Sequence, residues 1–432
     1  MKQFHFSLRN LQNILFYLTI LFLPTQFGRH FWPPFSFVSG IRVDYLSPTL
    51  FFTDVLLFLL FLFSMKKTFR ALVHFFSHRS IPFFITIGFF MTLFIGGILA
   101  INKGAFVLGL LRFLEGMFFC YCTRNFFKQK NTQIAFPFLL ALPIIFESLL
   151  AIAQFFLGQS VGSIFYFFGE RSFTGVTPGI ANASLNGQLI LRPYATFPHP
   201  NVLAGYLVSS LLFLFLLLFS SKNKRLLVFF IPVFILGSFA LFLILSRVAI
   251  FLEIVLLLVF GITFINQRFG KRGVSIFSFL ATLVLAAILF ATPLHHRFFF
   301  GSFFSDESVT MRASLQTAAI SMFLKHPFFG VGLSNFLPNL PLVLSNSGTI
   351  FYLQPVHNIF LLTLSETGLF GFLCIFLFCV FLTKRAWQQK NLFFLPILCI
   401  GFLGLFDHYP FSLQQGRLLM AFLIGVFLSR RK

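Results

Sequence analysis

Charged residues are scarce in this chain, and acidic residues are the scarcest of them. Only 10% of the 432 residues are charged, and 10 Asp and Glu residues stand against 32 Lys and Arg residues. Hydrophobic residues make up 58% of the sequence, and the mean hydropathy is +0.93. This composition excludes the soluble globular class. The sequence therefore predicts a single integral membrane domain over residues 1–432.

Several sequence patterns that signal common chemistries are also absent. The five cysteines all lie in apolar stretches, which argues against a disulfide framework and against an exposed zinc site. The chain contains no phosphate-binding Gly-rich loop and no dinucleotide-binding fingerprint, and its expected outer face has no Asp-x-Asp pattern. We therefore expect a mechanism that uses no ATP, no cofactor and no metal.

Apolar runs of about 20 residues, the length of one membrane span, recur along the whole chain. They predict an all-α, polytopic fold with about 12 transmembrane helices at 11–27, 48–65, 81–101, 106–122, 134–157, 201–219, 226–245, 248–265, 274–292, 357–382, 391–406 and 415–428. Basic residues gather after every second span, so the net charge of +22 indicates membrane orientation and not nucleic acid binding. We expect both termini to be cytoplasmic. Two long extracytoplasmic loops are expected at 158–200 and 293–356, the second with an amphipathic helix.

The expected span at 357–382 begins with a sequence motif: His357 and Asn358 are followed by nine residues and then by Gly368 and Gly371. At a helix start the dipole disfavours imidazolium and leaves a neutral ring that can accept a proton. At ~100° per residue, both glycines fall within roughly 40° of His357, which predicts close packing below the ring, whereas Glu366 falls about 180° away. His357 is therefore a candidate base and Glu366 a poor partner for it. The alternative is an interfacial histidine without a chemical role.

Arginines on the expected outer face oppose the positive-inside rule and are candidate anion ligands. Arg312 begins a helical stripe of apolar residues, so we expect it to point into the protein. A guanidinium makes two parallel charge-assisted hydrogen bonds to phosphate, so several on one face predict a polyanionic ligand. The alternative role is snorkelling to lipid headgroups. The candidates are Arg192, Arg247 and Arg312, with the polar residues His199 and Asn201 following Arg192.

Four motifs together resemble the O-antigen ligase and O-antigen polymerase superfamily. They occur in the family's order between about residues 190 and 375: Phe197-Pro198-His199-Pro200-Asn201, Ser246-Arg247, His326-Pro327-Phe328-Phe329-Gly330-Val331-Gly332, and His357-Asn358-x9-Gly368-x-x-Gly371. The resemblance implies a GT-C-type glycosyltransferase of the bacterial cytoplasmic (inner) membrane. Such an enzyme moves a glycan from an undecaprenyl-pyrophosphate carrier to an acceptor hydroxyl on the outer face.

The resemblance also implies roles for individual residues. It makes His357 the catalytic base, and it makes Arg312 and Arg247 the catalytic ligands of the pyrophosphate. The implied substrate-binding residues are Arg192, His199, Asn201 and Asn358. The expected partners are the lipid-linked glycan donor, an acceptor that is a glycan, a lipid or a protein, and membrane lipids, but no nucleic acid.

The motifs leave several functions open. A ligase, a repeat-unit polymerase and a protein O-oligosaccharyltransferase share them and differ in the acceptor. A flippase for polyprenyl-linked glycans is an alternative of another class, although the sequence shows no convincing internal repeat of the kind found in transporters. A related peptidoglycan polymerase would use an outer carboxylate, for which Asp306 is the candidate.

Overall fold

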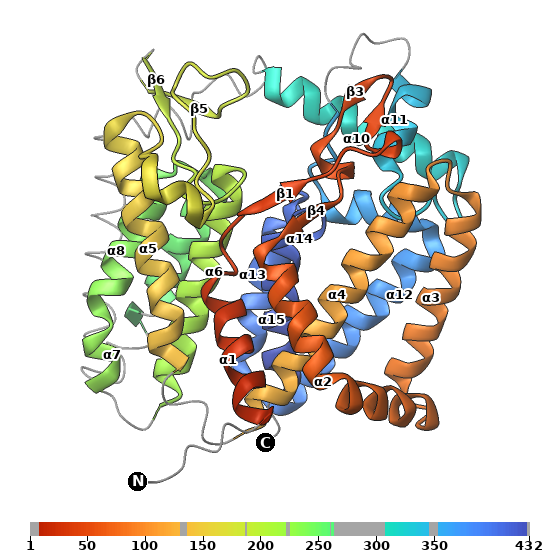
Figure 1. The fold of residues 1–432 in the computed structure, drawn as a ribbon, viewed down its shortest axis with the longest axis horizontal. Helices are drawn as coiled ribbons and strands as arrows, with labels where there is room; N and C mark the ends of the chain where they lie inside the picture. The colour runs from red at the N-terminus through yellow and green to blue at the C-terminus, as the bar shows by residue number, and fades with distance from the viewer. Residues whose placement is uncertain are drawn as a thin grey trace. The chain divides into compact units, whose positions relative to one another are not determined.

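The computed structural model describes residues 8–129, 136–185, 188–221, 225–259, 261–262, 307–344 and 353–429. Within these ranges the chain is mostly helical, and it divides into two compact units, residues 1–140 with 310–432 and residues 141–309 (Figure 1). The span expected at 274–292 and the candidate Asp306 lie outside the described residues.

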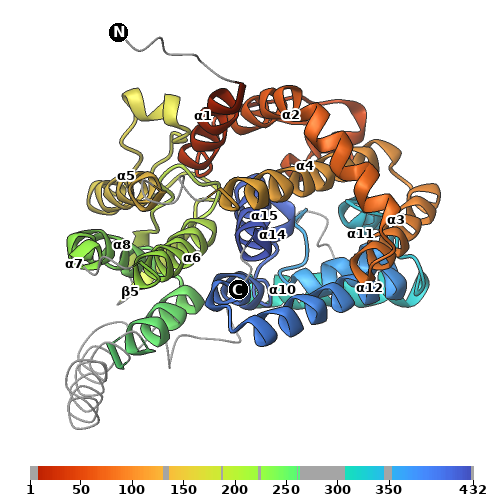
Figure 2. The same cartoon turned by 90° about the horizontal axis from the view of Figure 1, so that it is seen from below.

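The first unit is a helical bundle with short strands near its N-terminus. Its helices are α1 (Leu8–Leu21), α2 (Phe52–Ser77), α3 (Ile81–Leu99), α4 (Lys103–Phe127), α10 (Glu307–Lys325), α11 (Phe336–Leu344), α12 (Ile359–Gln389), α13 (Leu395–Leu403), α14 (Tyr409–Ser412) and α15 (Gln414–Ser429). Helix α15 packs along α4, α12 along α3, and α1 along α2 (Figure 2). The antiparallel strand pairs are β1 (Gly28–His30) with β4 (Thr49–Phe51), and β2 (Phe37–Val38) with β3 (Ile41–Arg42).

The second unit is helical with one hairpin. It contains most of α5 (Phe136–Leu157), the antiparallel pair β5 (Asn182–Leu185) and β6 (Gln188–Leu191), α6 (Pro200–Phe219), α7 (Arg225–Phe229) and α8 (Ile231–Leu243). A further helix begins at Arg247. Helix α8 packs on α6, where Gly237 lies against the side chain of Leu211.

Five described helices are long and apolar enough to cross a membrane: α3, α4, α5, α6 and α12, with mean hydropathies between 1.6 and 2.5. Shorter apolar helices at 231–243, 392–403 and 414–429 coincide with other expected spans. Large apolar side chains such as Phe94 and Leu111 are exposed on α3 and α4, as lipid-facing side chains are. The chain is therefore a polytopic helical membrane protein. The count of about 12 spans and the placement of the termini stay predictions.

Helix α10 is held to the first unit by an apolar stripe. Leu315, Ala319 and Met322 follow Arg312 at helical spacing, and each is only 1% exposed. They pack in one cluster with buried residues of α11 and α12, including Phe336. This burial fixes the face of α10 that carries Arg312.

Candidate active site

Helix α12 is interrupted at Gly368, and the interruption holds a turn from elsewhere in the chain. Gly368 has φ 64° and ψ −169°, so the helical hydrogen-bond ladder fails around it. The turn at residues 326–332, between α10 and α11, fills the gap. The amides of Val331 and Gly332 donate to the carbonyls of Ser365 and Glu366, each at 2.9 Å.

The 326–332 turn also accepts hydrogen bonds from the backbone amides that follow the break in α12. Those of Leu369 and Phe370 donate to the carbonyls of Pro327 and Phe328 at 2.8 and 3.2 Å. The 326–332 turn thus makes four reciprocal backbone hydrogen bonds with α12. They tie the C-terminal end of α10, the helix that carries Arg312, to the middle of α12, which begins two residues after His357.

The glycine spacing was predicted to let another helix pack below His357, and the structure corrects this interpretation. At Gly368 the neighbouring atoms are the backbone of Phe328, because a Cβ added there would lie 2.4 Å from that carbonyl. Helix α12 begins at Ile359 and breaks at Gly368, so angles computed along an unbroken helix from His357 do not apply. Only at Gly371 does a helix approach, where a Cβ would lie 3.2 Å from Thr92 of α3.

The entry of α12 is fixed by its N-cap and by the end of α13. The Asn358 side chain accepts hydrogen bonds from the amides of Phe360 and Leu361, at 2.9 and 3.0 Å. Its Nδ2 donates to the carbonyl of Leu405 at 3.1 Å, and the Ile359 amide donates to Gly404 at 2.8 Å. Asn358, predicted to bind substrate, therefore caps α12 and ties it to residues 404–405.

This tie brings an acidic residue beside His357. The Nδ1 atom of His357 lies 3.5 Å from Oδ1 of Asp407, and the two side chains are 12% and 10% exposed. On the other side of the ring, Nε2 lies 3.3 Å from Oε1 of Gln354. The neighbouring His408 ring lies 5.0 Å from that of His357, between centroids. Asp407 and His408 join the site although no motif in the sequence pointed to them.

His408 is held neutral by its surroundings. Burial lowers its pKa from 6.5 to about 4, and the positive charges of His357 and Arg312 act in the same direction, while Asp407 opposes the shift. Its Nδ1 lies 2.5 Å from the hydroxyl of Ser412, one turn further along the chain. His408 therefore presents a neutral ring toward His357.

Arg312 belongs to the same group of residues. Its charge acts on His408. Its Nε atom is buried and has no hydrogen-bond partner among the described residues. A buried guanidinium N–H without a partner is costly unless a ligand satisfies it. Arg312 thus supplies a cationic donor near His408.

Glu366, which helical arithmetic had placed away from His357, does not contact it. Its Oε1 accepts from the amide of Phe336 at 3.2 Å, at the first residue of α11. Two other buried carboxylates also accept hydrogen bonds. Glu147 accepts from the hydroxyl of Thr196 at 2.7 Å, and Glu253 from that of Ser238 at 2.5 Å.

The remaining predicted site residues lie in the second unit. Arg192 donates from Nε to the carbonyl of Ile244 at 3.0 Å, and from its terminal nitrogen to Oδ1 of Asn201 at 2.7 Å. His199 is the N-cap of α6, where its Nδ1 accepts from the Asn201 amide at 3.1 Å. Arg192, His199 and Asn201 therefore form one network that anchors the start of α6 to the end of α8.

Arg247 lies where the sequence predicted a turn. The chain leaves α8 through Leu245, which has φ 56°, and a new helix begins at Arg247 itself. Because Arg192 is bonded to Ile244, its guanidinium and Arg247 lie at the same break in the second unit.

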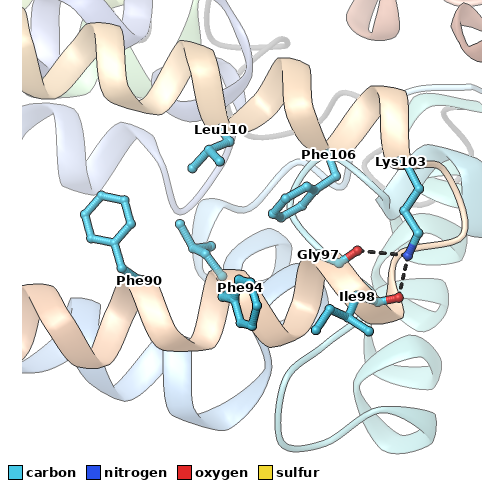
Figure 3. A pocket seen from close by; sticks show the side chains of 8 residues that line it. Phe90, Phe94, Gly97, Ile98, Lys103, Phe106 and Leu110 are labelled. Carbon is cyan, nitrogen blue, oxygen red and sulfur yellow. Dashed lines mark hydrogen bonds between the residues drawn. The ribbon is translucent and has the colours of Figure 1, made fainter.

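An apolar pocket lies apart from these polar groups. It has a volume of about 600 Å³ and lies between α3 and α4, lined by Phe90, Leu93, Phe94, Gly97, Ile98, Lys103, Phe106 and Leu110 (Figure 3). The Lys103 ammonium at one end donates to the carbonyls of Gly97 and Ile98. The pocket offers no acid or base other than this lysine, so the group around His357 is the better candidate site.

Comparison with known protein families agrees with the resemblance seen in the sequence. Residues 232–376 match the family model described as O-antigen ligase, a region that includes Arg247, Arg312 and His357. Asp407 and His408 lie beyond the matched region. No curated protein matches the chain. The chain is thus a multi-pass membrane protein in which residues 232–376 match the O-antigen ligase family domain.

Proposed function

We propose that the protein transfers a glycan from an undecaprenyl-pyrophosphate carrier to an acceptor hydroxyl, with His357 as the base. The observation that carries this proposal is the group of His357, Asp407 and Arg312, which combines a base, a carboxylate and a cation at the start of α12. Pyrophosphate is a good leaving group. The reaction therefore needs a base, charge stabilisation and a shielded site.

In the proposed reaction the acceptor oxygen forms a bond to the anomeric carbon while the bond from that carbon to the pyrophosphate oxygen breaks. In the reacting tautomer the ring's own proton is on Nδ1, facing Asp407, and Nε2 of His357 takes up the acceptor proton. The electron pair of the broken bond leaves with the pyrophosphate. Nδ1 of the resulting imidazolium faces Asp407 at 3.5 Å, which stabilises its positive charge. In the structure, Oε1 of Gln354 lies 3.3 Å from Nε2 of His357. We propose that the acceptor hydroxyl takes this position beside Nε2 during the reaction.

Arg312 is proposed to bind the pyrophosphate through its guanidinium, whose Nε atom has no hydrogen-bond partner among the described residues. The base and the guanidinium must face opposite sides of the anomeric carbon, because the reaction displaces the pyrophosphate from behind. Pyrophosphate binding by Arg247, and substrate binding by Arg192, His199 and Asn201, stay predictions. The outer-face location of the site is part of the same proposal.

The test is glycan transfer in proteoliposomes that contain a polyprenyl-pyrophosphate oligosaccharide. Three parallel reactions offer a lipid-linked core glycan, a second donor molecule and an unfolded protein as acceptors, which separates a ligase from a polymerase and a protein glycosyltransferase. Arg312→Gln should lower transfer by roughly 100- to 1,000-fold, the usual effect of losing one preorganised donor. Lys325→Gln, at the other end of α10, is the matched control. Equal loss in both variants would contradict the pyrophosphate role.

A further inference from the structure

His357, Asp407 and His408 form a group with the composition of a metal site. Each offers one ligand atom, and the three ligand atoms lie within 4.8 Å of one another. Two imidazoles and one carboxylate are the ligand set of many zinc sites. Unlike a surface cluster of acidic residues, the group is largely buried, since Asp407 and His408 are 7% and 3% exposed.

The distance between His357 and Asp407 suits a metal better than a direct hydrogen bond. Their Nδ1 and Oδ1 atoms are 3.5 Å apart, and Nδ1 is buried without a hydrogen-bond partner among the described residues. A tetrahedral zinc with bonds of about 2.0–2.1 Å holds neighbouring ligand atoms roughly 3.3 Å apart. The two atoms therefore already have nearly the required separation.

In both histidines, the ring nitrogen that would not bind the metal faces a polar side chain, as is usual for metal-binding histidines. A metal-binding histidine normally uses its second nitrogen for a hydrogen bond that fixes ring and tautomer. His357 meets Oε1 of Gln354 at 3.3 Å, and His408 meets the hydroxyl of Ser412 at 2.5 Å. In the tautomer in which Oε1 of Gln354 accepts a hydrogen bond, His357 carries its proton on Nε2. Its Nδ1 lone pair then points toward Asp407.

We propose that these three residues bind a divalent transition metal ion, zinc by preference, and that the bound ion inhibits the protein by occupying His357. The inhibition rests on the proposed function, whereas the binding does not. Zinc coordinates Nδ1 of His357, Oδ1 of Asp407 and Nε2 of His408, with water as the fourth ligand. A ring that binds zinc through Nδ1 and carries its proton on Nε2 has no free lone pair, so it cannot take up the acceptor proton. Zinc is thus an inhibitor at this site and not a cofactor.

The Arg312 charge provides an internal check. A nearby guanidinium disfavours a second cation but favours pyrophosphate. Arg312→Gln should therefore raise zinc affinity while it lowers glycan transfer. A purely structural role of Arg312 would not move the two measurements in opposite directions.

Zinc binding is measured by isothermal titration calorimetry on the full-length protein in detergent. Other paired histidines must be removed first. The rings of His74, in the last turn of α2, and His78, which follows that helix, lie 3.9 Å apart between centroids, and His295 and His296 are adjacent in the sequence. The background protein therefore carries glutamine at these four positions. It should bind one zinc ion. Substitution of Co²⁺ for zinc should give the visible ligand-field bands of a tetrahedral site.

His408→Gln and Asp407→Asn should each weaken zinc binding at least about tenfold. Gln354→Ala leaves all three metal ligands in place and removes only the side chain that faces Nε2 of His357. It should weaken zinc binding roughly 10- to 100-fold, and it tests the site even if the ligand variants misfold. His326→Gln, at an exposed histidine of the 326–332 turn, should change nothing. Affinities equal to that of the background in all three site variants would overturn the site.

The inhibitory action is read from transfer in the same background with and without zinc, and after chelation. Transfer should fall as the site fills and return when the ion is removed. Site-dependent binding that leaves transfer unchanged would overturn the inhibition and count against His357 as the base. Because calorimetry needs no transfer, failure of the site and failure of the proposed function give different results.

Discussion

Gly368→Ala tests the junction that holds α10 and α12 together. Two effects add at this position. Backbone at φ 64° and ψ −169° is open almost only to glycine, and forcing another residue into it costs about 1–3 kcal/mol. The new Cβ would also lie 2.4 Å from the backbone carbonyl of Phe328, which cannot rotate away as a side chain can.

The loss of stability follows from these contacts. Relieving the overlap requires the 326–332 turn to move from α12, where four backbone hydrogen bonds hold it. Loss of two of these bonds, at about 1 kcal/mol each, added to about 2 kcal/mol of backbone strain, gives roughly 4 kcal/mol. Scaled to 432 residues, the shift is about 1 °C for each kcal/mol, so the melting temperature should fall by roughly 4 °C.

The assay is thermal unfolding in detergent, followed by tryptophan fluorescence, with Gly116→Ala as the matched control. Gly116 lies in α4, and no neighbouring atom lies within 4 Å of the position that a Cβ would take there. Alanine at this position should leave the melting temperature unchanged or raise it slightly, because alanine favours a helix over glycine by about 1 kcal/mol. Equal melting temperatures for the two variants would refute the junction as described.

Two further predictions concern Asp407 and His408. An ion pair at 3.5 Å is worth roughly 4–5 kcal/mol at an effective dielectric of 20, and partial exposure reduces this to about 2 kcal/mol. Asp407→Asn should therefore lower kcat for transfer about 30-fold with little change in KM; Asp44→Asn, at an exposed carboxylate, is the control, and an unchanged kcat would remove Asp407 from the mechanism. His408 has a folded-state pKa of about 4, below its ordinary 6.5, so the unfolded state takes up the proton first as pH falls. Stability should be full above about pH 6.5 and decrease toward pH 4, and chemical denaturation should show this decrease flattened in His408→Gln; parallel profiles would contradict the buried neutral ring.

Local patterns in the sequence were sufficient to locate the helices and several individual residues. Hydropathy placed α3, α5 and α6 within two residues of their observed bounds, whereas α4 and α12 end five and seven residues beyond their expected ends, at Phe127 and Gln389. Helical spacing anticipated the buried stripe behind Arg312. These properties depend on residues within a few turns of one another, which a pattern can reveal.

Long-range contacts were beyond such patterns. The partner of His357 is Asp407, placed beside it only because Asn358 and Ile359 bond to the end of α13. The break at Gly368 exists because a turn from residues 326–332 supplies its hydrogen bonds. A helical-wheel projection shows only the residues of one regular helix, so it could predict neither the contact with Asp407 nor the break at Gly368. The scarcity of acidic residues was the one available signal, because Asp407 lies alone between two apolar spans.

The central claim, that His357 is the base for glycan transfer, is tested most directly by the initial rate of His357→Gln in proteoliposomes. The rate is measured with saturating lipid-linked donor and compared with that of His326→Gln. Loss of a general base should lower it by roughly 100- to 10,000-fold, while the melting temperature and donor binding stay close to those of the parent. A rate for His357→Gln within about threefold of the parent would contradict the mechanism.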